Sequence, residues 1–177
     1  MAIRDIYLLG SGVLRKRSEE VAQVDDEVRR VIDDLFETMD AAKGVGLAAN
    51  QVGVTQRVAV VGIEGDRFAM VNPVIVSAEG RSRAEEGCLS IPEIYAEVVR
   101  PERIVLDAVD RDGQPFRREI GGYLARAVHH EIDHLDGIVF LDHLSLLKRE
   151  ILLRRWKKEH RGGDLIRKIT PEDGTRS

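Results

Sequence analysis

Three of the five histidines of this chain lie within six residues, in the stretch "AVHHEIDHLDG" at residues 127–137. Residues four apart on an α-helix project from one face, so His130 and His134 can direct imidazole nitrogens at one metal ion. Glu131 lies beside such an ion, where its carboxylate can take a proton from metal-bound water. His129 lies about 100° around the helix from His130, so we expect it outside the pair. The HExxH pattern indicates a metal hydrolase, although two helical histidines can also be ordinary polar surface.

Two histidines need a third ligand, and the common completions of HExxH are incomplete here. A continuation as HExxHxxGxxH has its glycine at Gly137 but ends at Phe140, which cannot bind metal. Another class takes a glutamate from a following helix, and Arg154 stands at that spacing. His143 is a conceivable ligand, but it follows the glycine that ends the helix. The remaining candidate is Cys88, the one cysteine of the chain.

Cys88 lies in the stretch "EEGCLSIPE" at residues 85–93. Gly87 allows close backbone approach and Pro92 favours an extended or turning path, so we expect a strand edge that presents the thiol. A Cys-His-His set would leave a fourth position of the ion open for water, which is typical of catalytic sites. The alternative is a small buried apolar residue.

Three motifs in order resemble the signature motifs of the bacterial type of peptide deformylase: "GVGLAANQVG" at 44–53, "EEGCLSIP" at 85–92 and "HHEIDHLDG" at 129–137. The likeness covers nearly the whole chain up to residue 160. The chain departs from the family at His129, where glutamine is usual, and at "GSGVL", where "GDPVL" is frequent. The resemblance implies removal of the formyl group from N-formylmethionyl nascent polypeptides, with release of formate. Metal-bound water or hydroxide would attack the formyl carbon, with Glu131 as general base and acid.

The resemblance also assigns the metal site and the oxyanion site. Cys88, His130 and His134 would bind one Fe²⁺ per chain, and Zn²⁺, Ni²⁺ or Co²⁺ could substitute for it. The side-chain amide of Gln51 and the backbone N–H of Leu89 would stabilise the negative charge that develops on the formyl oxygen.

For the substrate, the resemblance implies contacts on both sides of the metal site. The residues assigned to substrate binding are Val45, Gly46, Gly87, Tyr123 and Ala127. Glu86 and Arg100 match an ion pair that braces the strand of the cysteine.

The elements that must position these residues predict an α+β fold. Apolar spacing indicates an amphipathic helix capped by Asp25 or Asp26 and stopped at Gly44. Runs typical of strands follow at 57–63, 68–76 and 103–110, and Asp112-Gly113 indicates a hairpin. "GVGLAA" follows a helix and leads toward a strand, which excludes a dinucleotide-binding fingerprint. We expect small β-sheets packed around a central helix at 121–137 that carries HExxH, with an N-terminal helix and a C-terminal helix at 144–160.

Length and composition indicate one cytoplasmic domain. At 177 residues the chain suits a single core, so we expect a catalytic domain over 1–161 and a flexible tail over 162–177. The net charge of −4 does not favour binding to DNA or to a membrane, and no apolar run is long enough to span a bilayer. A single cysteine allows no internal disulfide, which fits a reducing compartment.

The C-terminal helix has a charge of opposite sign to the rest of the chain. Residues 148–161 carry seven Lys or Arg against two Glu, a net +5. One interpretation is an amphipathic helix whose stripe of Leu144, Leu147 and Ile151 packs on the domain. The other is docking on the ribosome through phosphate contacts, and both can hold at once.

Two other functions stay open from the sequence. The first is a metal-dependent peptidase or acyl-amine hydrolase of different specificity, which the missing third-ligand patterns disfavour. The second is a non-catalytic metal- or ribosome-binding protein, which the presence of Glu131 and Gln51 disfavours.

Overall fold

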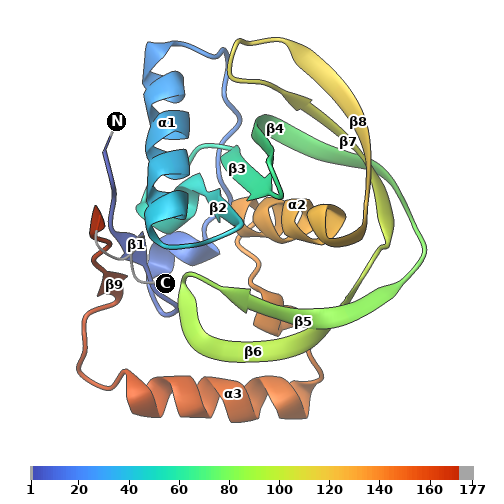
Figure 1. Cartoon of the computed structure of the whole chain (residues 1–177). Helices are drawn as coiled ribbons and strands as arrows, with labels where there is room; N and C mark the ends of the chain where they lie inside the picture. Colours follow the sequence, from blue (N-terminus) through green and yellow to red (C-terminus); the bar gives the residue numbers. More distant parts are fainter. Residues whose placement is uncertain (1, 172–177) are drawn as a thin grey trace.

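Strands fill the middle of the chain and helices lie toward both ends, as the sequence predicts (Figure 1). The computed structural model describes residues 2–171. The helices are α1 (Asp26–Ala41), α2 (Gly122–Leu135) and α3 (Leu146–Glu159), with short 3-10 turns at Gly12–Arg15, Ala49–Val52 and Phe140–His143. The strands are β1 (Ile6–Tyr7), β2 (Gly46–Ala48), β3 (Val58–Ile63), β4 (Asp66–Glu79), β5 (Ser82–Cys88), β6 (Ile91–Arg100), β7 (Arg103–Val109), β8 (Pro115–Gly121) and β9 (Ile166–Arg167).

Strand β3 separates two hydrophobic clusters, one on each side of the main sheet. Successive side chains of a strand point to opposite faces. Val58 and Val60 pack with the apolar face of α1, whereas Ala59 and Val61 pack with α2. The motif helix α2 is therefore central, and the predicted α+β class with HExxH on this helix is confirmed (Figure 1).

Helix α1 begins and ends close to its predicted limits. The side chain of Asp25 accepts a hydrogen bond of 2.9 Å from the backbone N–H of Val28, which satisfies a free donor of the first turn. The helix ends at Ala41, and Lys43 has a positive φ of 58° that turns the chain toward Gly44 and β2.

The main sheet is antiparallel, with strand order β2-β3-β4-β7-β8. The hairpin expected at Asp112-Gly113 joins β7 to β8. Gly113 has a φ of 83°, and a side-chain oxygen of Asp110 accepts bonds from the backbone N–H groups of Asp112 and Gln114. The turn chemistry thus places this hairpin where the sequence predicts it.

A second hairpin, β5–β6, carries the cysteine and was only partly predicted. The sequence indicated an extended edge at Cys88, but not the ten residues of β6. Ile91, Ile94 and Val98 of β6 form a third cluster with Phe140 and Trp156. This cluster holds the end of β5 against the centre of the molecule.

The prediction that Leu144, Leu147 and Ile151 pack α3 on the domain is wrong for Leu147 and Ile151, whereas Leu144 contacts the third cluster. Leu147 is 69% exposed and Ile151 is 56% exposed, whereas Leu152, Leu153 and Trp156 face the third cluster. The helix therefore turns a different face to the domain than its sequence suggests. Trp156 determines this face, because it packs against residues of β6 and its indole donates a bond of 3.0 Å to the carbonyl of Leu9. No helix in residues 2–171 is long and apolar enough to span a membrane.

The segment predicted as a flexible tail returns to the N-terminal part of the chain. Strand β9 pairs with β1, and the N–H of Leu8 donates a bond of 2.8 Å to the carbonyl of Leu165. Ile169 is buried in the first cluster. Residues 166–169 are thus packed on the domain, and positions 172–177 of the predicted tail lie outside the described residues.

Candidate active site

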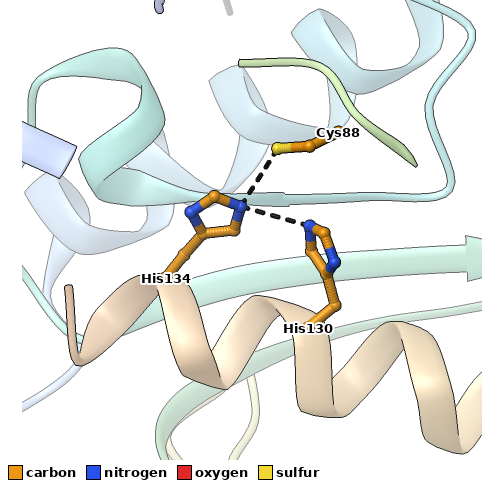
Figure 2. A group of neighbouring side chains, drawn as sticks. All are labelled: Cys88, His130 and His134. Carbon is orange, nitrogen blue, oxygen red and sulfur yellow. Dashed lines mark hydrogen bonds between the residues drawn. The ribbon is translucent and has the colours of Figure 1, made fainter. Parts of the chain in front are cut away.

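Cys88, His130 and His134 come together from two elements (Figure 2). The histidines lie one turn apart on α2, and Cys88 is the last residue of β5. Nε2 of His134 lies 3.2 Å from Nε2 of His130 and 3.3 Å from Sγ of Cys88. The three ligand atoms lie within 4.8 Å of one another, and residues 2–171 contain no other such group of three His, Cys, Asp or Glu side chains.

The geometry of this cluster fits a metal ion. Tetrahedral ligands at about 2.0–2.3 Å from one ion lie roughly 3.3–3.7 Å apart, close to the distances found here. Two imidazoles and a thiolate are also the donor types that a borderline-soft divalent ion binds. Beside them, Oε2 of Glu131 is buried without a hydrogen-bond partner among the described residues. Because buried polar atoms are normally paired, this oxygen indicates a site for water or substrate.

A buried carboxylate fixes the orientation of one of these imidazoles. Oε1 of Glu86 lies 3.0 Å from Nδ1 of His130, which leaves Nε2 directed at the cluster. Arg100 binds both oxygens of Glu86, at 2.7 and 2.9 Å, and Arg126 adds a bond of 2.6 Å. The predicted pair of Glu86 and Arg100 is present, whereas the contacts of Glu86 with His130 and Arg126 were not predicted.

Asp133 extends the same network away from the cluster. Its Oδ2 accepts a bond of 2.8 Å from Arg100 and lies 2.7 Å from Nε2 of His143. Asp133 is buried, and the guanidinium that it binds is buried as well. His143 is held in this contact and does not join the cluster. His129 also stays outside it, half-buried on α2.

Burial and neighbouring charges shift the acid–base groups of the site in different directions. Burial would raise the pKa of Glu86, but hydrogen bonds with His130 and Arg100 outweigh it and hold the pKa well below its ordinary value. Burial raises the pKa of Glu131 to about 7. Burial opposes a charge on His130, yet Cys88 and Glu86 raise the pKa of its ring to about 10. Burial and the neighbouring His130 instead lower the pKa of His134 well below its ordinary value. A metal ion that binds here competes with protons for its ligands.

Strand β2 lies directly against the glutamate of the motif. A Cβ atom at Gly46 would lie only 2.8 Å from Oε1 of Glu131. Any side chain at position 46 would thus displace the carboxylate. This close approach explains why the first sequence motif needs a glycine at this position.

The amide of Gln51 is oriented toward the cysteine. Its Oε1 accepts a bond of 3.0 Å from the backbone N–H of Ala48, so that its amide nitrogen faces the other way. This nitrogen lies 3.0 Å from Oγ of Ser90 and 3.6 Å from Sγ of Cys88. The donor assigned to the formyl oxygen therefore lies next to the proposed metal ligand.

A cavity of about 740 Å³ opens above the cluster. Every residue that the resemblance assigns to the substrate or the oxyanion lines it: Val45, Gly46, Gln51, Gly87, Leu89, Tyr123 and Ala127. Cys88, His130 and Glu131 line it too, whereas His134 is fully buried behind them. Ala127 is buried, and Tyr123, at 56% exposure, lies at the rim.

Several residues of the cavity were missed by the sequence reasoning. Tyr95 lies over Gly87, where a Cβ atom would come within 2.6 Å of its ring. The place of Arg126 could have been predicted from the helix register, because it lies one turn before His130 on the same face of α2. His160 and Arg167 come from the end of the chain, and no local pattern could have placed them at this cavity.

Comparison with known proteins agrees with this geometry. Residues 3–150 match the family described as polypeptide deformylase. A peptide deformylase of Alkalilimnicola ehrlichii is 50% identical over 167 residues, which cover 92% of this chain and 94% of that protein. The crystal structure of a peptide deformylase from Legionella pneumophila has a TM-score of 0.85 and 44% identity, covering 90% of this chain and 96% of that one. The peptide deformylase from Ehrlichia chaffeensis, in complex with actinonin, has a TM-score of 0.86 and 40% identity, covering 91% and 99%. With its motifs on one cavity and similarity over nearly its whole length, this chain belongs to the polypeptide deformylase family.

Proposed function

We propose that this protein removes the formyl group from N-formylmethionyl nascent polypeptides by metal-dependent hydrolysis, at an ion held by Cys88, His130 and His134. The observation that carries this proposal is the meeting of these three donors beside a buried oxygen of Glu131 that has no hydrogen-bond partner in residues 2–171. When bound, the ion would supply a Lewis acid and lower the pKa of a coordinated water toward neutrality.

Glu131 is the proposed general base and acid. It accepts a proton from the attacking water and returns it to the leaving nitrogen, which becomes the free amine of methionine. In the metal-free protein burial raises the pKa of this carboxyl to about 7, and a group with a raised pKa can both take and give a proton near neutral pH. Gly46 keeps the carboxylate in place by leaving it room against β2.

Gln51 and the backbone N–H of Leu89 are the proposed donors to the formyl oxygen. As the formyl carbon becomes tetrahedral, this oxygen gains negative charge, and fixed donors stabilise it more than they stabilise the substrate. The bond from Ala48 to Oε1 supports this role, since it keeps the amide nitrogen of Gln51 on the side of Cys88.

The methionine side chain is proposed to enter the cavity beside α2. Ala127 gives a buried apolar floor, and Val45 and Tyr123 lie at the edge. Gly46 lies on β2, which pairs only with β3 among the described strands, and Gly87 lies on β5, which pairs only with β6. The free edges of these two strands are the proposed contacts for the peptide backbone.

We propose Fe²⁺ as the native ion, with Zn²⁺, Ni²⁺ or Co²⁺ able to substitute. The donor set suits each of these ions, and intrinsic affinity favours Zn²⁺ over Fe²⁺, so the resemblance to the family is what favours iron. Metal analysis of protein purified without oxygen, followed by reconstitution with each ion, tests this choice.

The ribosome is a second proposed partner, reached through α3 in the cytoplasm, where nascent chains are made. Leu147 and Ile151 are exposed beside the exposed cations Lys148, Arg154 and Lys158. Reversing the charges with Arg154→Glu and Lys158→Glu should weaken co-sedimentation with ribosomes. Unchanged co-sedimentation would refute this partner.

The main test is anaerobic formate release from formyl-Met-Ala-Ser by Fe²⁺-loaded protein. We expect stoichiometric formate and free Met-Ala-Ser, and a strong loss with Glu131→Ala at unchanged metal content. Cleavage of an internal peptide bond instead would support the metallopeptidase alternative. Metal binding without turnover would support a binding protein.

A further inference from the structure

Two cations at the mouth of the cavity are not explained by the hydrolysis itself. Lys43 and Arg167 both line the cavity, and Arg167 lies beyond residues 3–150, which match the deformylase family. Neither side chain has an ion pair with any residue in 2–171. These two charges are therefore available to a ligand.

The backbone holds Arg167 firmly in this place. Arg167 pairs with Ile6 in the β1–β9 ladder, and Ile6 is fully buried. The bond from Leu8 to Leu165 before it and the buried Ile169 after it fix the segment on both sides. Arg167 is half-buried, which restricts its side chain more than an exposed one.

The mouth is also where the rest of a peptide substrate must pass. The deep end is closed by the buried residues Glu131 and His134. A chain whose formyl group reaches Cys88 therefore leaves past the exposed rim. One carboxylate, Glu93, lies on this rim, so the two cations outnumber it.

We propose that Arg167, assisted by Lys43, is a specificity residue that favours a carboxylate shortly after the formylmethionine. This inference rests on the proposed deformylation. The carboxylate can belong to an Asp or Glu side chain, or to the free C-terminus of a short formyl peptide. Because the contact is the same before and during the reaction, it should lower KM and leave kcat nearly the same.

The test compares three peptides on the metal-loaded protein: formyl-Met-Ala-Ser amide, formyl-Met-Ala-Asp amide and formyl-Met-Ala-Ser with a free carboxylate. We expect kcat/KM for a charged peptide to exceed that for the neutral amide roughly three- to tenfold at low salt, mainly through KM. Near 1 M salt, where the Debye length is about 3 Å, this preference should fade. The Asp amide and the free acid distinguish the two sources of the carboxylate.

The variants are judged by the ratio of the charged to the neutral peptide, in which any inactive fraction cancels. Arg167→Gln should reduce the ratio at least about threefold, Arg167→Glu should reduce it further, and Arg167→Lys should retain most of it. Arg30→Gln, an exposed arginine of α1 that does not line the cavity, is the control with the same charge change and an unchanged ratio. An equal ratio in the wild type and Arg167→Gln would overturn the inference while deformylation stands. No formate from any peptide would instead refute the deformylation and this inference with it.

Discussion

Helices α2 and α3 have the same length, fourteen residues each, but opposite relations to solvent. In α2 ten residues are buried, among them Arg126, Glu131 and Asp133, whereas in α3 only Trp156 is. A buried charge is costly unless it is paired, so Arg126 and Asp133 depend on Glu86 of β5 and Arg100 of β6. The charges of α3 lie in water, where single ion pairs contribute little. The two helices should therefore respond very differently to substitution.

The largest effect is expected at Glu131 on α2. Glu131→Gln keeps the shape of the side chain beside Gly46 but cannot carry a proton between water and the leaving nitrogen. Formate release should fall roughly 10²- to 10⁴-fold while metal content stays the same. Glu150→Gln on exposed α3 makes the same chemical change and should leave formate release unaltered. Comparable turnover in the two variants would exclude Glu131 as the base.

The next largest effect concerns the partner that two buried carboxylates share. Arg100→Met removes the cation between Glu86 and Asp133 and should lower the free energy of unfolding by about 3–5 kcal/mol. Urea unfolding of the metal-free protein measures this change. Arg154→Met on α3 should stay within about 0.5 kcal/mol of the wild type. A small loss for Arg100→Met would show that water replaces the guanidinium.

This network also marks the limit of what the sequence could predict. The Cys-His-His set, Glu131 and Gln51 follow from motif resemblance, and α1, α2 and the Asp112-Gly113 hairpin follow from capping, periodicity and turn chemistry. The contact of Glu86 with His130 joins residues 44 positions apart, and Arg167 reaches the cavity only because β9 pairs with β1. Such contacts depend on the packing of distant segments, which no local pattern contains. The orientation of α3 was missed for the same reason, because the site for Trp156 is made by β6 and Leu9.

A smaller effect is expected from acid. The folded-state pKa of Glu86 lies below its ordinary value of 4.5, so the unfolded chain binds more protons at low pH. The stabilising contribution is complete above the unfolded value and is lost as the pH falls below about 4.5 toward the folded pKa. For the metal-free wild type this loss should be on the order of 1–3 kcal/mol.

Glu86→Gln serves as the reference for that measurement. This variant should be less stable at neutral pH, but its free energy of unfolding should decline less steeply between about pH 5 and pH 3, the range around the pKa of an unfolded glutamate. Some decline with acid should remain in this variant because of Asp133. Burial would raise the pKa of Asp133, but its bonds with His143 and Arg100 outweigh burial and lower it. Parallel curves for the wild type and Glu86→Gln would mean that Glu86 does not carry the acid sensitivity.

The smallest effect is expected at a leucine on the open face of α3. Leu147 is 69% exposed, and alanine is an equally good helix former, so Leu147→Ala should change the free energy of unfolding by less than about 0.5 kcal/mol. Leu135→Ala is the matched substitution on α2, where the side chain is fully buried, and it should cost about 2–5 kcal/mol. A loss above about 2 kcal/mol at Leu147 would mean that α3 packs through the stripe that its sequence suggests. A small loss leaves Leu147 available to a partner, so that any weaker co-sedimentation of Leu147→Ala with ribosomes would report on docking and not on folding.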